Sequence, residues 1–234
     1  GVDLVAHRLG ELTGGDAPAP NPALLLGAVD FSPLNVAELY GVLASGGFRT
    51  PLRAVLEVSD ASGNALERYP LNVRAAADPA AVDQVVQAMQ QTFERGTAKS
   101  AAVPPGLRAA GKTGTTDGGR DSWFAGFTGD RLAVVWIGRD DNEQTRLTGS
   151  SGALPVWSEI MTRLPTTSLV GHTGAEQASV QIDYATGRLV RAGCADAISV
   201  RLPEDTELEV DPACDPGRQS IVERGKEWLK RLTR

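Results

Sequence analysis

The sequence predicts an α+β fold, in which helices flank an antiparallel sheet and a smaller β-rich unit follows. Two segments with apolar residues at helical spacing open on Ser32-Pro33 and Asp78-Pro79, a capping residue followed by proline at the first helical position. The strand-like runs 123–128 and 132–138 flank Gly129-Asp130, which is typical of an antiparallel hairpin. Towards its end the chain changes to short β-like pieces separated by glycine-rich and acidic turns.

The composition is typical of a globular chain with one good core, or with a larger domain and a small appendix. The 234 residues are 41% hydrophobic. A net charge of −6 and the lack of a long basic run argue against nucleic acid as a partner. No apolar run approaches the roughly 18 residues of a membrane span. His7 and His172 stand alone, so neither a metal site nor a cofactor is expected.

Three helices are predicted in the first half of the chain. The first covers 2–12 and ends at Gly14-Gly15, and the second runs from the Ser32 cap to Gly46-Gly47. The third begins at Asp78 and ends at Arg95-Gly96. Its predicted inward side chains are Val82, Val85, Val86, Met89 and Phe93. Between the second and third helices, the runs 53–58 and 65–69 flank Ser62-Gly63-Asn64, which predicts a hairpin with this tripeptide at its tip.

The most chemically distinctive stretch is Lys112-Thr113-Gly114-Thr115-Thr116. The lysine is a compact cation with three donors, the threonine hydroxyls can contact a carboxylate, and Gly114 lets another backbone approach. The cluster 117–120 that follows is a turn that cannot continue a helix. Lys112 is therefore expected on a strand beside the 123–138 hairpin. A last helix is predicted through Trp157, with Ser150 and Ser151 as its caps.

K-T-G is also a signature element of penicillin-binding proteins and class A β-lactamases. Nearly the whole chain resembles the closing part of the transpeptidase domain of bifunctional class A penicillin-binding proteins. Its tail, which bears Cys194 and Cys214, is similar to that of the 1B type from Gram-negative bacteria. The segments that carry the resemblance are AGKTGTT (110–116), DSWFAGF (121–127), AVVWIGRDDN (133–142), LTGSSGA (147–153) and the stretch 23–52.

The resemblance implies a penicillin-binding-protein/β-lactamase-like transpeptidase fold for 1–168 and a small C-terminal domain for 169–234, which ends in an amphipathic helix over 222–232. It implies a serine-type D-Ala-D-Ala transpeptidase of peptidoglycan synthesis, with peptide stems as substrates and β-lactams in the same site. Lys112 would be catalytic. The substrate-binding residues would be Thr113, Gly114, Thr115 and Thr116.

The resemblance also implies a parent protein at the periplasmic face of the bacterial inner membrane. That parent would carry a glycosyltransferase domain, and outer-membrane lipoprotein activators and division proteins would be among its partners. From the residues alone, Cys194 and Cys214 are equally compatible with a disulfide and with two reduced thiols. The resemblance favours the disulfide, because it places the protein in an oxidising compartment.

One departure from the family pattern is expected to matter. Family members acylate on the serine of S-x-x-K and use a second motif, S-x-N, but none of the lysines here has a serine three residues before it. The one S-x-N string considered, Ser62-Gly63-Asn64, is the predicted hairpin tip. The chain is therefore expected to be a fragment that begins after both motifs and is inactive alone.

Two other interpretations stay open at this point. A non-catalytic module that binds peptide stems or a partner would also lack the serine. Residues 106–113 fit the P-loop pattern G-x-x-x-x-G-K-[ST]. A phosphate loop must however follow a buried strand and open a helix, whereas here Val103-Pro104-Pro105 precede it and a glycine-rich turn follows.

Overall fold

The computed structural model describes residues 1–171 and 177–215, and the chain divides into two compact units, Gly1–His172 and Thr173–Arg234. Leu169, which was expected to start the second unit, is buried in the core of the first. Its N–H donates to the carbonyl oxygen of Arg108, with N and O 2.9 Å apart. The first unit therefore extends a few residues beyond the expected boundary. The terminal helix predicted over 222–232 lies outside the described residues.

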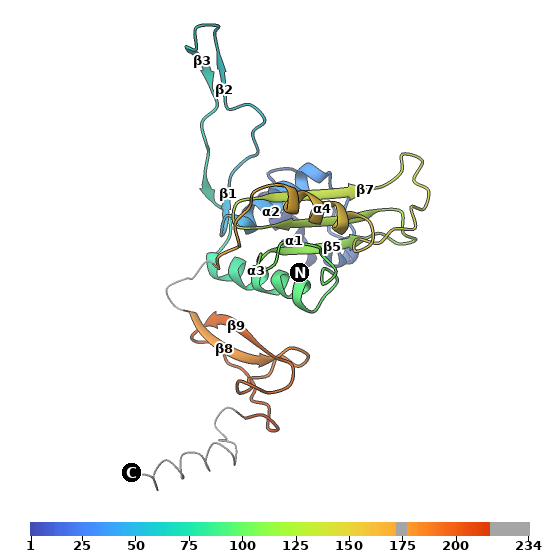
Figure 1. The fold of residues 1–234 in the computed structure, drawn as a ribbon, viewed down its shortest axis with the longest axis vertical. Helices are drawn as coiled ribbons and strands as arrows, with labels where there is room; N and C mark the ends of the chain where they lie inside the picture. Colours follow the sequence, from blue (N-terminus) through green and yellow to red (C-terminus); the bar gives the residue numbers. More distant parts are fainter. Residues whose placement is uncertain (172–176, 216–234) are drawn as a thin grey trace. The chain divides into compact units, whose positions relative to one another are not determined.

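The first unit is organised around a three-stranded antiparallel sheet in the order β5-β6-β7 (Figure 1). These strands are β5 (Ala110–Thr115), β6 (Ser122–Phe127) and β7 (Leu132–Ile137). The predicted α+β class and the three-stranded order are both confirmed. Because β6 is central, β5 is an edge strand that pairs only with β6 within this sheet. The residues of the motif lie on that edge.

Capping side chains start two of the helices as the sequence predicts. Ser32 Oγ accepts from the N–H of Asn35 at 3.2 Å, and the carboxylate of Asp78 accepts from Ala80 and Ala81. The helices are α1 (Val2–Thr13), α2 (Pro33–Ala44), α3 (Pro79–Glu94) and α4 (Ala153–Arg163), with a 3-10 turn, η1 (Pro22–Leu26).

Ser150 and Ser151 do not cap α4. The N-cap residue is Gly152, and it makes no side-chain cap hydrogen bond. The hydroxyl of Ser151 instead accepts from the N–H of Thr148 at 2.9 Å. The two serines are therefore part of a compact loop before α4, which the capping prediction did not anticipate, because serine hydroxyls close local turns as readily as they cap helices.

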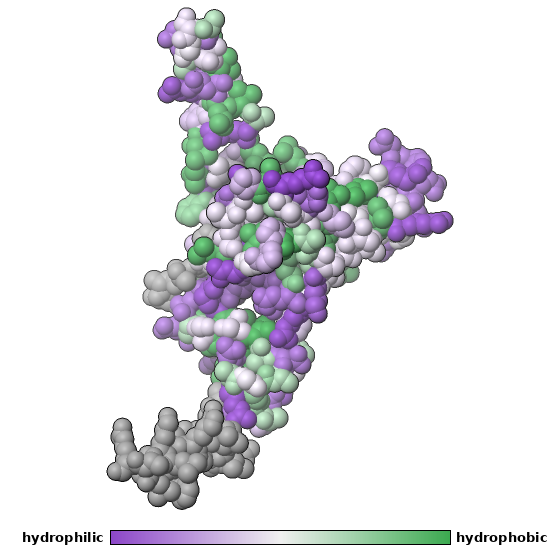
Figure 2. Space-filling view, viewed as in Figure 1, coloured by the Kyte–Doolittle hydropathy of each residue, from purple (hydrophilic) through white to green (hydrophobic). Residues whose placement is uncertain are grey.

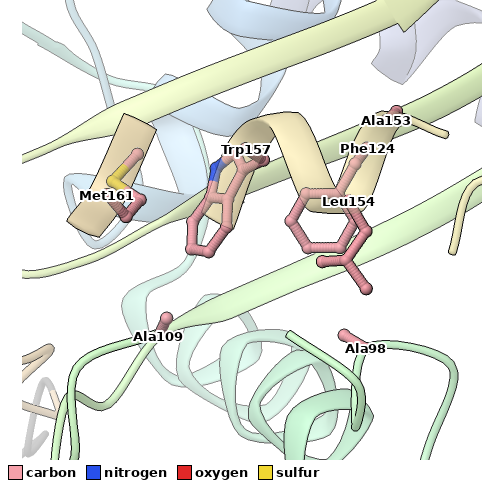
Figure 3. Close-up of a cluster of buried hydrophobic side chains, with 7 residues drawn as sticks. All are labelled: Ala98, Ala109, Phe124, Ala153, Leu154, Trp157 and Met161. Atoms are coloured by element: carbon pink, nitrogen blue, oxygen red, sulfur yellow. The ribbon is translucent and has the colours of Figure 1, made fainter. Parts of the chain in front are cut away.

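Helices cover both faces of the sheet, and each face has its own core cluster. On one face, Phe124 of β6 packs with Trp157 of α4, their ring centroids 5.1 Å apart (Figure 3). On the other face, Phe127 packs against α3 and α2. Phe124 and Phe127 are three residues apart on one strand, so they point to opposite faces. In α3, Val82, Val86 and Met89 are buried as predicted, whereas Val85 is 47% exposed because it lies outside the buried arc of the helix.

The segment that connects α2 to α3 in the chain forms a hairpin arm, which projects from the sheet-and-helix body (Figure 1). At its base β1 (Phe48–Arg49) pairs with β4 (Arg74–Ala75), and at its end β2 (Glu57–Ser59) pairs with β3 (Ala65–Arg68). Ser62-Gly63-Asn64 form the tip, as predicted, and Gly63 has a φ of 84°. Much of the arm is hydrophobic at its surface (Figure 2). Its exposed apolar side chains are Phe48, Leu52, Val55, Leu56, Val58, Leu66, Tyr69, Leu71 and Val73.

The second unit contains a two-stranded antiparallel sheet of β8 (Gln177–Asp183) and β9 (Ala197–Pro203). A disulfide joins Cys194 to Cys214, whose Cα atoms lie 6.4 Å apart. That separation is within the usual range for a bridge. Backbone hydrogen bonds from Arg191 to Cys214 and from Cys194 to Arg191 hold the same segments together. The disulfide therefore ties the β8–β9 connection to the end of the described chain.

Candidate active site

The motif occupies the exposed part of edge strand β5. Lys112 lies opposite Ala125 of β6, and Gly114 lies opposite Trp123, so these four residues share one face of the sheet. Thr113 and Thr115 point to the other face, where α4 packs. Lys112 and Thr115 are exposed, and Thr113 is half-buried. The strand thus presents a cation on one face and two hydroxyls on the other, along an edge without a strand partner in this sheet.

The ammonium group of Lys112 lies close to the main chain of the same strand. Its Nζ is 2.9 Å from the carbonyl oxygen of Thr113. The carbonyl oxygen of Gly111, two residues earlier, accepts from Thr92 Oγ1 of α3 at 2.8 Å. Within the described ranges no ion pair includes Lys112. The cation therefore keeps its charge uncompensated at the strand edge, where an anionic ligand can reach it.

Both threonine hydroxyls on the opposite face are held by residues distant in sequence. Thr113 Oγ1 lies 2.7 Å from Thr97 Oγ1, in the loop after α3. Thr115 Oγ1 accepts a hydrogen bond from the N–H of Gly149, with N and O 2.9 Å apart. A hydroxyl has one proton and two lone pairs, so each keeps further capacity for a ligand. The structure thus fixes the position of the two hydroxyls and leaves each able to form a hydrogen bond with a ligand.

Thr116 follows the end of β5 and closes the β5–β6 turn. Its hydroxyl donates to the carboxylate of Asp121 at 3.0 Å and accepts from the N–H of the same residue at 2.9 Å. The other carboxylate oxygen of Asp121 accepts from the indole N–H of Trp136 at 2.9 Å. Thr116 also borders a pocket of about 410 Å³. Its other lining residues are Val29, Asp30, Phe31, Ser32, Pro33, Asp121, Trp123 and Trp136.

The P-loop geometry is absent from this region. Lys112 is the third residue of a β-strand, and the next described element is another strand, β6, rather than a helix. A phosphate loop requires a helix N-terminus directed at the anion. The match of residues 106–113 to the nucleotide-binding pattern is therefore a coincidence of sequence.

Sequence reasoning identified the strand but not the residues that hold it. Thr97 and Gly149 contact the motif from 16 and 34 residues away. The segment 147–153, which contains Gly149, contributed to the family resemblance, but its pattern gave no indication of what it contacts. Among the described residues, no group of three or more His, Cys, Asp or Glu side chains is arranged to hold a metal ion.

The family model for the penicillin binding protein transpeptidase domain matches residues 10–162. The chain therefore belongs to the penicillin-binding protein transpeptidase family. It is 43% identical over 143 residues to penicillin-binding protein 1B of Haemophilus influenzae, a match that covers 61% of this chain and 18% of that protein. To penicillin-binding protein 1B of Escherichia coli it is 35% identical over 209 residues, which covers 86% of this chain and 24% of that protein.

Solved structures show the same fold. A crystal structure of penicillin-binding protein 1A from Haemophilus influenzae superposes with a TM-score of 0.74 at 20% identity, over 91% of this chain and 38% of that one. PonA1 from Mycobacterium tuberculosis, in complex with penicillin V, gives a TM-score of 0.55 at 26% identity, over 73% of this chain and 50% of that one.

The match to the curated relatives is partial in length. The chain spans between 18% and 24% of the two 1B proteins described above. None of the helices in the described ranges has the length and apolar content needed to cross a membrane.

Proposed function

We propose that this chain forms the lysine-bearing part of the active site of a serine-type peptidoglycan D,D-transpeptidase. The observation that carries the proposal is the position of Lys112, exposed on an edge strand with no carboxylate partner among the described residues, in a chain of the transpeptidase family. An exposed strand edge can pair with an extended peptide, which is the form of a peptidoglycan stem. A cation and two hydroxyls along that edge suit the terminal carboxylate of such a stem.

The reaction would be acyl transfer through a covalent intermediate. A serine oxygen attacks the carbonyl carbon of the D-Ala-D-Ala bond, and that bond breaks as the terminal alanine leaves with a proton on its nitrogen. An amine of a neighbouring stem then attacks the ester carbonyl, loses a proton, and restores the serine hydroxyl. A β-lactam acylates the same serine when its ring amide opens, and no amine follows.

In this scheme each residue of the motif has a distinct part. Lys112 supplies positive charge to the carboxylate and to the groups that move the serine proton. Thr113 and Thr115 donate hydrogen bonds to the carboxylate. Gly114 has Trp123 Cβ only 3.1 Å from where its own Cβ would lie, so it keeps the strand close to β6. The hydroxyl of Thr116 is engaged with Asp121, so its contribution is to shape the end of the strand.

The nucleophile would come from a part of the polypeptide that this sequence does not contain. No lysine in the 234 residues follows a serine at S-x-x-K spacing, and Ser62-Gly63-Asn64 is a hairpin tip whose turn is closed by the carboxylate of Asp60. We infer that the chain alone is inactive and that the parent protein also carries a glycosyltransferase domain. Outer-membrane lipoprotein activators and division proteins would be partners of that parent.

The disulfide of the second unit supports an oxidising cellular compartment. A disulfide such as Cys194–Cys214 persists in an oxidising environment, and the bacterial periplasm is one. We therefore place the domain on the periplasmic face of the inner membrane.

Covalent labelling with a fluorescent penicillin tests the proposal. The 234-residue chain is expected to remain unlabelled, whereas the longer protein that contains it is expected to be labelled on one serine, located by peptide mass spectrometry. Labelling of the chain alone would contradict the assignment of the nucleophile. A longer protein that is folded but unlabelled would favour a non-catalytic binding module instead.

A further inference from the structure

The loop that precedes α4 packs directly against the motif strand through Gly149. The N–H of Gly149 donates to Thr115 Oγ1 at 2.9 Å. A Cβ atom at this position would lie 2.6 Å from the carbonyl oxygen of Trp123 and 2.8 Å from that of Gly114. It would also lie 2.8 Å from Thr113 Cβ. Real Cβ atoms do not approach so closely, and the two carbonyl oxygens cannot rotate away as a flexible side chain could. Only glycine brings the loop this near to β5.

The loop itself is anchored at both ends. The fully buried Ser122 Oγ donates to the carbonyl oxygen of Thr148 at 2.8 Å and accepts from the N–H of Ala153, the first residue of α4, at 2.9 Å. The N–H of Gly152 returns to the carbonyl oxygen of Thr148 at 2.9 Å. These hydrogen bonds fix the loop to β6 and to α4. The direction of the Gly149 N–H is thereby set by the core rather than by the exposed strand.

This contact determines which way the Thr115 hydroxyl can donate. One lone pair of Oγ1 is occupied by the Gly149 N–H, so the hydroxyl proton cannot point at that N–H and takes one of the two remaining directions. Thr115 is exposed, and its proton is thus free to meet a ligand. A donor oriented in advance avoids the ordering cost that a freely rotating hydroxyl incurs when it binds.

We propose that Gly149 is a positioning residue, which orients the Thr115 hydroxyl to donate a hydrogen bond to the carboxylate of the peptide stem or of a β-lactam. This inference rests on the proposed transpeptidase function. It adds that the loop 148–152 sets, through Thr115, how well the strand recognises that carboxylate.

A double-mutant cycle in the longer protein tests the coupling, with the second-order rate of acylation by a fluorescent penicillin as the readout. Labelling of the wild type first establishes the proposed function, and its failure would count against that function rather than against Gly149. Gly149→Ala and Thr115→Val are each expected to slow acylation at least about tenfold, a charge-assisted hydrogen bond being worth about 1.5–3 kcal/mol. The double variant is expected within about threefold of Thr115→Val alone, because both changes remove one interaction.

Gly41→Ala provides the matched control, since a Cβ at Gly41 in α2 meets no heavy atom within 4 Å. It is expected to be acylated at the wild-type rate. Wild-type acylation by Gly149→Ala, or losses that multiply fully in the double variant, would overturn the proposal, because a merely structural role gives independent losses.

Hydrogen–deuterium exchange decides the question if Gly149→Ala does not fold. Peptides covering 147–153 are compared in the Thr115→Val and Thr115→Ser variants of the longer protein. The Gly149 amide is expected to exchange at least about tenfold faster in the valine variant, which has no acceptor, and at the wild-type rate in the serine variant. Equal exchange in all three proteins would show that the hydrogen bond does not form, and the proposal would fail.

Discussion

The ammonium nitrogen of Lys112 lies 2.9 Å from the carbonyl oxygen of Thr113, its own neighbour on strand β5. A main-chain carbonyl is a weak partner for a full positive charge compared with a carboxylate. The lysine is therefore held at the strand edge without being neutralised. A ligand carboxylate that displaces the carbonyl would gain a charge-assisted hydrogen bond.

Replacement of this lysine should abolish most activity without loss of the fold. Lys112→Ala in the longer protein is expected to slow penicillin acylation by about 10²–10³-fold, the usual cost of removing one group aimed at developing charge. Because Lys112 is exposed, the thermal midpoint of the Lys112→Ala variant should stay near that of the wild type. Arg68→Ala, which removes an exposed cation from the hairpin arm, should leave acylation unchanged. Wild-type acylation rates in a folded Lys112→Ala protein would refute the role of the cation.

The hydroxyl of Thr113 raises a different question, because it also contacts Thr97 at 2.7 Å. Thr113→Val is expected to slow acylation by about one to two decades, and Thr113→Ser to remain near the wild type. Thr97→Val removes the protein partner alone and is expected to cost no more than about threefold. If Thr97→Val costs as much as Thr113→Val, the hydroxyl serves to hold the loop after α3, and its contact with the substrate carboxylate is refuted.

Local sequence signals predicted the elements that depend on neighbours in the chain. Ser32 and Asp78 mark helix starts because their side chains bond to amides two or three residues away, and the glycine-rich turn after Thr116 returns the chain to β6. The contacts that organise the motif strand are not local. Gly149 meets Thr115 only because the Ser122 hydroxyl and the start of α4 position the loop between them. Hydrophobic periodicity and capping rules do not predict this contact between Gly149 and Thr115.

The exact position of the boundary between the two units depends on contacts of the same kind. Leu169 lies where the sequence changes to short β-like pieces. Its burial depends on a backbone hydrogen bond to Arg108 and on the core cluster that contains Ala110 of β5 and Phe127 of β6. Likewise, Arg49 and Glu38 form an ion pair at 2.6 Å that joins β1 to α2. The residues next to either partner in the sequence do not predict this ion pair.

Acid should weaken the end of the first unit through Asp130. Its Oδ1 accepts from the N–H of Thr167 at 2.8 Å and from Thr166 Oγ1 at 2.9 Å. These hydrogen bonds, that from the Thr167 backbone first, hold the pKa of the Asp130 carboxyl below its usual value. A carboxyl whose pKa is lower in the folded than in the unfolded state adds stability above its unfolded pKa of about 3.9, and that stability is lost as the pH falls through the folded value.

The thermal midpoint of the wild type is therefore expected to fall below about pH 4 more steeply than that of Asp130→Asn. The asparagine keeps an acceptor oxygen but carries no titrating charge. Calorimetric scans at several pH values between pH 7 and pH 3 give the comparison, with Asp117→Asn as a control that removes an exposed carboxylate of the β5–β6 turn. Parallel curves for the wild type and Asp130→Asn would show that the hydrogen bonds to Asp130 do not favour its charged form.

The disulfide between Cys194 and Cys214 should stabilise the second unit and leave the motif strand unaffected. The bridge closes a segment with a sequence separation of 20, for which the chain-entropy model gives about 3 kcal/mol. In the described part of this unit, Val190 is buried, whereas Tyr184 and Val210 remain exposed, so its apolar core is small and needs a covalent link.

Cys194→Ser with Cys214→Ser in the longer protein should therefore raise hydrogen–deuterium exchange throughout 177–215. Exchange over 110–116 and the rate of penicillin acylation should match the wild type, because those properties depend on contacts within the first unit. Unchanged exchange in 177–215 would show that the disulfide is dispensable for this unit. Slower acylation would show that the disulfide affects the candidate active site, which the contacts around β5 do not predict.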